Sequence, residues 1–167
     1  FAKSGFPSSV FINLVIGSDR VGKIIEDDIV KAVSLTGSEF AGRKVAEVAG
    51  SNIKKTLLEL GGSNAFVVLA DANVEKAVEI GIRARMQNAG QSCIAAKRFI
   101  VHEKVSEKFI TLFKEGLSKL QSGDPTNEET NIGPLATIEQ AETIEKQVRI
   151  SVEMGARIIT GGVRNGT

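Results

Sequence analysis

The chain has very few of the residues that build disulfides and metal sites: its 167 residues include one cysteine and one histidine. One cysteine cannot form an internal disulfide, so the sequence favours a reducing, cytoplasmic compartment. One cysteine and one histidine also cannot supply the usual three or four ligands of a zinc site without carboxylates at a telling spacing beside them. We therefore expect no metal.

An excess of one charge and a long apolar run are also missing. The chain has 21 basic and 20 acidic residues, a net charge of +1, which gives no electrostatic reason to expect a nucleic acid or an anionic membrane as partner. No apolar stretch approaches the roughly 20 residues needed to cross a bilayer, and no secretory signal opens the chain. The sequence predicts a soluble protein without nucleic-acid or membrane partners.

What is present is an alternation of β-prone apolar runs with helix-like segments, which favours an α/β fold with a parallel sheet and helical crossovers. Strands are expected at residues 11–16, 30–35, 54–60, 65–69, 96–101 and 157–160. Helices are expected at residues 21–26, 39–49, 74–87 and 104–120, and again after Thr137. Asn73 and the pair Thr137 and Gln140 are placed to cap two of these helices.

Two short motifs carry reactive side chains: LLELGG at residues 57–62 and QNAGQSCIAA at residues 87–96. A Cys93 thiolate attacks a carbonyl carbon well, and Glu59 can then activate water against the resulting thioester. Taken singly, each motif has a simpler interpretation, since a lone cysteine is usually a small buried hydrophobe and Gly-Gly after an apolar run is usually a turn. Together and in this order they favour catalysis.

The two motifs resemble the signature pair of the aldehyde dehydrogenase superfamily. The resemblance covers nearly the whole chain, because AVSLTGSEFAG at residues 32–42 is similar to the family's strand, phosphate turn and helix, with Leu35 where phenylalanine is usual. GDP at 123–125 and NIGPL at 131–135 are similar to its connecting segment. The resemblance implies an α/β, parallel-sheet aldehyde dehydrogenase-like fold.

The resemblance also implies a domain boundary close to Gly61. Residues 1–60 would be the C-terminal part of a Rossmann-like NAD(P)-binding domain, and residues 61–167 the N-terminal part of the cysteine-bearing α/β catalytic domain. Phe1 stands where a complete chain would begin with methionine, which indicates truncation. We expect the isolated chain to be inactive or nearly so.

A cofactor site is expected where a strand ends and a helix begins, because a helix N-terminus attracts the pyrophosphate of a dinucleotide. An ordinary serine cap at Ser38 is the simpler interpretation of this turn. No G-x-G-x-x-G sequence is present, and the family is known for a nucleotide-binding fold without it. The resemblance implies NAD or NADP as cofactor, without deciding between them, and implies binding residues Gly17, Gly22, Thr36, Gly37, Ser38, Gly42 and Leu60.

The mechanism implied by the resemblance starts with attack of Cys93 on an aldehyde to give a thiohemiacetal. Hydride leaves for the nicotinamide, Glu59 deprotonates a water that hydrolyses the thioester, and a carboxylic acid is released. The backbone N–H of Cys93 is the expected oxyanion donor, together with an asparagine outside this chain. His102 is a rival base, but an extended strand would place it on the order of 20 Å from the thiol loop, as a surface histidine at a strand end.

The substrate is expected to be succinic semialdehyde or a related short aldehyde, because AAKRFIV at residues 95–101 resembles the succinate-semialdehyde dehydrogenase branch. Many semialdehyde members place an arginine directly before the Asn-Ala-Gly-Gln run, to hold the substrate carboxylate, and this chain has Gln87 there. Arg83 and Arg85 lie nearby, and we expect both to be solvated helix charges. The family resemblance further implies a homo-oligomer for the full-length enzyme.

Two alternatives stay open. In a coenzyme-A-acylating aldehyde dehydrogenase the thioester passes to a thiol in place of water, although such members generally lack the carboxylate found here at Glu59. In a truncated, non-catalytic module, the chain would pack with a partner or act as a redox sensor through Cys93.

Overall fold

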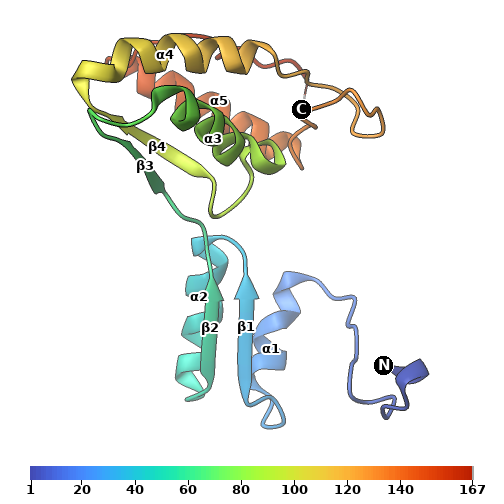
Figure 1. Ribbon diagram of the computed structural model, residues 1–167. Coiled ribbons are helices and arrows are strands. Elements are labelled where there is room, and N and C mark those ends of the chain that lie inside the picture. The colour runs from blue at the N-terminus through green and yellow to red at the C-terminus, as the bar shows by residue number, and fades with distance from the viewer. Residues whose placement is uncertain (167) are drawn as a thin grey trace. The chain divides into compact units, whose positions relative to one another are not determined.

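A computed structural model describes residues 1–166 of the chain (Figure 1). The chain divides into two compact units, unit 1 (Phe1–Gly61) and unit 2, which begins at Gly62. Each unit contains a two-stranded sheet, and both sheets are parallel. The expected α/β architecture with parallel strands is therefore confirmed.

Unit 1 contains one β-α-β segment, preceded by three short helices. Its elements in order are η1 (Ala2–Ser4), η2 (Ser18–Arg20), α1 (Val21–Glu26), β1 (Ala32–Thr36), α2 (Glu39–Ser51) and β2 (Lys55–Glu59). The register pairs Ala32 with Lys55 and Thr36 with Glu59. Both strands therefore end together, so that whatever follows β1 lies beside the end of β2.

The core of unit 1 lies between the two helices and one face of the sheet. Ile25 of α1 and Val45 and Ala49 of α2 are buried, and Val33 and Leu35 of β1 pack against them. Alternate residues of β1 point away from this core, as the pleat of a strand requires. The opposite face of the same sheet is open, with Leu57 60% exposed.

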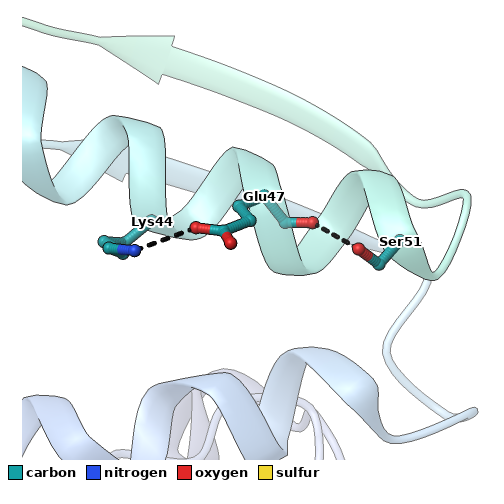
Figure 2. Close-up of polar contacts among 3 residues, drawn as sticks. All are labelled: Lys44, Glu47 and Ser51. Atoms are coloured by element: carbon teal, nitrogen blue, oxygen red, sulfur yellow. Dashed lines mark hydrogen bonds and ion pairs between the residues drawn. The ribbon is translucent and has the colours of Figure 1, made fainter.

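The polar side of α2 is held by contacts within the helix itself (Figure 2). The Lys44 ammonium lies 3.0 Å from a Glu47 carboxylate oxygen, and the Ser51 hydroxyl donates to the Glu47 carbonyl at 2.9 Å. Because pairs three or four residues apart share one helix face, these contacts fix a solvent-facing side and leave Val45 and Ala49 for the core.

Unit 2 contains a second parallel pair and three longer helices. Its elements in order are β3 (Asn64–Val68), α3 (Val74–Met86), η3 (Gln87–Gly90), β4 (Ala96–Val101), α4 (Glu103–Ser118) and α5 (Ile138–Glu153). Phe66 of β3 is opposite Phe99 of β4, and the register shifts between Asn64 and Ala65. The shift lies at the end of β3 that leads in from the Gly61-Gly62 segment.

Aromatic rings fill the core of unit 2. Phe109 of α4 is 4% exposed and stacks on Phe113 with ring centroids 5.3 Å apart, and Phe99 packs edge-on against Phe113 at 5.0 Å. Gly81 lets α3 approach these rings, since a Cβ there would lie 3.1 Å from Phe99 and 3.3 Å from Phe113. This tight packing anchors both β4 and α3, the two elements that flank Cys93 in the sequence.

The expected helix caps are confirmed. Asn73 Oδ1 accepts from the Lys76 N–H at 2.9 Å at the start of α3, and Thr137 Oγ1 accepts from the Gln140 N–H at 3.2 Å at the start of α5. Such side chains satisfy N–H groups that the first helical turn leaves without intrahelical partners.

Two expected strands, residues 11–16 and 157–160, are wrong. Both segments lack strand structure, and no described segment pairs with either. A strand needs a neighbour to take its backbone hydrogen bonds, and apolar composition alone does not supply one. Val15 is accordingly 95% exposed. The four remaining strand expectations agree with β1 to β4 to within one or two residues at each end.

No helix among residues 1–166 combines the length and the apolar character needed to cross a membrane.

Candidate active site

The thiol of Cys93 is free and exposed on a loop of unit 2. We call residues 87–95 the thiol loop; it connects the end of α3 to the start of β4 and includes η3. The expectation that a lone cysteine is usually buried does not hold here. A thiol that is both unpaired and accessible can meet a small electrophile.

The backbone of the thiol loop is strained. Asn88, Ala89 and Gly90 have φ angles of 51°, 53° and 78°, so three successive residues adopt the left-handed conformation. For a residue with a Cβ this conformation costs about 1–2 kcal/mol, and such strain gathers at functional sites. Glycine suits position 90 because it adopts positive φ without a steric penalty, and because a Cβ there would lie 2.7 Å from Arg85 Nη2 and displace it.

Gln91 joins the thiol loop to the segment before α5. Its Oε1 accepts from the Ala136 N–H at 2.9 Å, and its Nε2 donates to the Asn88 carbonyl at 3.2 Å. One side chain thus links two segments 45 positions apart and also closes the strained turn.

Lys97, the second residue of β4, turns its ammonium back onto the thiol loop. Lys97 Nζ donates to the carbonyl oxygens of Ser92 at 2.9 Å, Cys93 at 3.2 Å and Ala95 at 3.4 Å. An ammonium has three N–H donors, and these three contacts use all of them. The backbone N–H of Cys93 makes no hydrogen bond within residues 1–166.

The last glycine of the LLELGG motif lies directly against the thiol loop. A Cβ on Gly62 would lie 3.0 Å from the Cys93 carbonyl oxygen. Beside it, Arg98 of β4 donates from Nε and Nη2 to the Ser63 carbonyl, at 3.1 and 3.0 Å. The segment that enters unit 2 is therefore fixed to the strand that leaves the thiol loop.

Glu59, the other expected catalytic residue, is the last residue of β2 in unit 1, whereas Cys93 belongs to unit 2. It is exposed, and its carboxylate makes no hydrogen bond or ion pair in the part of the chain that the structure describes. The Gly37 N–H donates to the Glu59 carbonyl at 3.0 Å, and Thr36 is its partner in the register. The carboxyl ends of parallel strands are the usual ligand-binding edge of such sheets.

Ser38 caps α2, as the simpler interpretation proposed, because its Oγ accepts from the Ala41 N–H at 3.2 Å. This cap satisfies one of the N–H groups in the first turn of α2. Within residues 1–166 the N–H groups of Glu39 and Phe40 make no hydrogen bond, so two donors at the positive end of a helix dipole are free for an anion. These groups fit a dinucleotide pyrophosphate.

Gly42 and Leu60, both expected near the cofactor, contact each other. A Cβ on Gly42 would lie 2.7 Å from Leu60 Cδ2, so glycine is required for Leu60 to pack on the first turn of α2. Gly17 precedes η2, and Gly22 is the second residue of α1. In Figure 1 α1 and β1 run in opposite directions, which puts the start of α1 at the same end of unit 1 as the end of β1.

His102 is a surface residue at the end of β4, as expected. Its Nδ1 accepts from the Lys104 N–H at 3.2 Å and caps α4, a role that the sequence analysis missed. Among residues 1–166 no group of three or more His, Cys, Asp or Glu side chains is arranged to hold a metal ion.

The two arginines of α3 differ. Arg83 is exposed and lines an open hollow of about 640 Å³ together with Gln87, Asn88 and Asn131. Arg85 is half-buried, and its Nη1 donates to the Ala96 carbonyl at 3.3 Å, so the expectation of a solvated charge is wrong for this residue. The guanidinium also lies close to the strained turn, since a Cβ on Gly90 would lie 2.7 Å from Arg85 Nη2.

Comparison with known proteins gives concordant matches. The family model described as the aldehyde dehydrogenase family matches residues 1–167. The chain is 46% identical over 162 residues to an aldehyde dehydrogenase of Paenarthrobacter nicotinovorans, covering 97% of this chain and 35% of that protein. It is 48% identical over 160 residues to succinate-semialdehyde dehydrogenase [NADP(+)] of Mycobacterium avium (strain 104), covering 96% of this chain and 34% of that protein.

A solved structure shows the same fold. The structure of succinic semialdehyde dehydrogenase from Streptococcus pyogenes in complex with NADP+ as the cofactor matches with a TM-score of 0.93 at 36% identity, over 99% of this chain and 36% of that one. The chain thus spans about a third of the length of the relatives it matches. With the family model matched from end to end, this chain belongs to the aldehyde dehydrogenase family.

Proposed function

We propose that this chain supplies the nucleophile and the water-activating base of an NADP-dependent dehydrogenase that oxidises succinic semialdehyde, or a related short aldehyde, to the carboxylic acid. The observation that carries the proposal is the thiol loop. Its Cys93 thiol is exposed, its carbonyl groups are held by Lys97, and the Cys93 N–H has no partner in the described chain.

Cys93 has two roles in this proposal. Its sulfur forms a bond to the aldehyde carbon, and its backbone N–H donates to the oxygen that becomes negatively charged in that step. A bound nicotinamide would supply a hydride acceptor, and loss of hydride from the carbon bonded to sulfur would leave a thioester on Cys93.

Glu59 takes a proton from water, whose oxygen then bonds to the thioester carbon while the carbon–sulfur bond breaks and returns the thiolate. The position of Glu59 at the carboxyl end of β2, with its carboxylate free of other partners within residues 1–166, supports this role. It also favours hydrolysis over acyl transfer to coenzyme A.

The residues that would hold the cofactor are the turn Thr36, Gly37 and Ser38 and the start of α2, with Gly42 and Leu60 shaping the first helical turn and Gly17 and Gly22 near the start of α1. The free N–H groups of Glu39 and Phe40 support this assignment. NADP is preferred over NAD because the Mycobacterium avium relative is named for NADP(+) and the Streptococcus pyogenes structure contains it.

Succinic semialdehyde is the proposed substrate because relatives at 45 to 48% identity carry its name. Gln87 still stands where many semialdehyde members have arginine, so the substrate carboxylate would need a cation from elsewhere in the full-length protein. Two proposals remain: the cytoplasmic location rests on the single cysteine, and the homo-oligomer in the full-length protein rests on the family resemblance.

The test is reduced-nicotinamide formation by the full-length protein that carries this chain, with succinic semialdehyde, butyraldehyde and propionaldehyde, each with NADP and with NAD. We expect turnover to be highest with succinic semialdehyde and NADP. Equal kcat/KM for succinic semialdehyde and butyraldehyde would contradict carboxylate recognition. Turnover that depends on added coenzyme A would favour the acylating alternative, and no turnover with any aldehyde would favour the non-catalytic one.

Gly62→Ala is expected to lower kcat/KM for the aldehyde by on the order of 10-fold, since small displacements of reacting groups cost up to about 10²-fold. The new Cβ would lie 3.0 Å from the Cys93 carbonyl oxygen, so the thiol loop must shift. Gly61→Ala is the matched control, because a Cβ there meets nothing within 4 Å. Steady-state kinetics of both variants make the comparison, and equal losses would show that the contact with Cys93 is not the cause.

A further inference from the structure

Lys97 stands out in unit 2 as an exposed lysine whose ammonium is fully engaged by backbone. Its three contacts are all with carbonyl groups of the thiol loop, at 2.9, 3.2 and 3.4 Å. A flexible side chain loses rotamer freedom in such an arrangement, and charge-assisted hydrogen bonds are the interactions strong enough to offset that loss. Lys97 therefore restrains the backbone of the thiol loop, and its role differs from that of an ordinary solvated surface lysine.

The shortest of these contacts involves the peptide unit between Ser92 and Cys93. All peptide bonds of the described chain are trans, and in a planar trans peptide the C=O and the N–H point in opposite directions. Because the Ser92 carbonyl points at Lys97, the Cys93 N–H points away from Lys97. That N–H has no partner within residues 1–166.

The same contact also polarises the peptide unit. The positive charge of the Lys97 ammonium beside the Ser92 carbonyl oxygen draws electron density away from the amide nitrogen of Cys93. Hydrogen bonds in such a chain strengthen one another by about 10–30% each. The Ser92 oxygen in addition accepts from the Ala95 N–H at 3.1 Å, so two donors act on it. Both make the Cys93 N–H a better donor.

We propose that Lys97 is a positioning residue for aldehyde oxidation, which aims and strengthens the Cys93 backbone N–H as donor to the oxyanion that forms when the thiol attacks. This inference rests on the proposed function and adds a residue to it. Lys97 does not touch the substrate; it acts through the Ser92–Cys93 peptide unit.

The test uses two reactions of the same thiol in the full-length protein. Aldehyde oxidation places negative charge on an oxygen beside the Cys93 N–H. Alkylation of Cys93 by iodoacetamide forms a carbon–sulfur bond with loss of iodide and needs no oxyanion donor. The aldehyde reaction is followed as the single-turnover rate of nicotinamide reduction and as kcat/KM. Alkylation is followed against pH up to its plateau, where the thiol is fully ionised and only its access and placement matter.

Lys97→Met and Lys97→Gln are expected to slow nicotinamide reduction by about 10-fold, a fraction of the roughly 10²–10³-fold that loss of a whole oxyanion donor costs. The alkylation plateau is expected to change by less than about 2-fold, since the thiol itself stays accessible. Lys97→Arg keeps the charge and is expected to retain activity to within about 3-fold. KM for NADP is expected to stay unchanged in all three.

Lys114→Met is the matched control, because Lys114 is an exposed lysine of unit 2 whose ammonium makes no hydrogen bond or ion pair within residues 1–166. A purely structural role for Lys97 predicts that oxidation and alkylation fall together, and that result overturns the inference, as does unchanged oxidation in Lys97→Met and Lys97→Gln. Absence of wild-type turnover with every aldehyde would overturn the proposed function and this inference with it. If the wild type is active and the Lys97 variants oxidise the aldehyde at the wild-type rate, this inference is overturned and the proposed function is not.

Discussion

Cys93→Ala in the full-length protein is expected to lower aldehyde-dependent nicotinamide reduction by at least about 10⁴-fold, because removal of a covalent nucleophile leaves only the contribution of binding and oxyanion donors. The exposed thiol on the strained loop is the one cysteine of the chain. Alanine keeps the backbone N–H in place and removes only the reacting atom, so the loss reports on the sulfur. Steady-state and single-turnover assays both measure it.

Ser92→Ala is the control for a change of side chain on the same loop. The Ser92 hydroxyl makes no hydrogen bond within residues 1–166, and only its carbonyl meets Lys97. Loss of the Ser92 hydroxyl is expected to change turnover by less than about 3-fold. NADP binding, followed by fluorescence titration, is expected to be unchanged in Cys93→Ala, since the proposed cofactor residues belong to unit 1. More than a trace of turnover in Cys93→Ala would assign the nucleophile to another part of the protein.

Glu59→Gln is expected to separate the two halves of the reaction. The amide has the shape of the carboxylate but cannot take a proton from water, and a general base contributes about 10²–10⁴-fold. We therefore expect a rapid burst of reduced nicotinamide of about one equivalent per active site, followed by turnover slowed by that factor. Stopped-flow absorbance measures the burst, and intact-protein mass spectrometry detects the acyl group that accumulates on Cys93.

Glu47→Gln is the matched control for Glu59→Gln, since Glu47 is an exposed residue of the same unit whose carboxylate pairs with Lys44 on the surface of α2 (Figure 2). It is expected to change turnover by less than about 2-fold. A Glu59→Gln enzyme that shows no burst and no mass increase would place Glu59 in an earlier step. One that turns over at the wild-type rate would assign the base elsewhere.

The elements that the sequence predicted well are those decided by local chemistry. The caps at Asn73 and Thr137 depend on residues three positions apart, and the short strands of each pair are marked by apolar runs between turns. The runs at 11–16 and 157–160 have similar composition but no partner strand in the described chain. Strand formation depends on a neighbour that composition does not reveal.

In the candidate site, too, some residues could be predicted from local sequence and others depend on the fold. Cys93 and Glu59 could be proposed from the sequence because motif chemistry and family resemblance both pointed to them. The contacts of Gln91, Lys97 and Arg85 were missed because each depends on how the thiol loop folds back on itself, with three residues of positive φ. The only sequence signal for Lys97 was its place in the AAKRFIV run, which marked a family branch without indicating a contact.

The packing around the end of β2 links the proposed anion site at the start of α2 to the position of Glu59. The Gly37 N–H is bonded to the Glu59 carbonyl, and Leu60 packs on Gly42 in the first turn of α2. The start of α2 and the Glu59–Leu60 segment are therefore directly connected by a hydrogen bond and a packing contact. An anion that orders the start of α2 is therefore expected to order the segment that carries Glu59, the proposed base. By thermodynamic linkage, restraint of that segment would raise the affinity for the anion by the same factor. In the proposed mechanism, occupancy of the dinucleotide site and the position of the Glu59 carboxylate are therefore thermodynamically coupled.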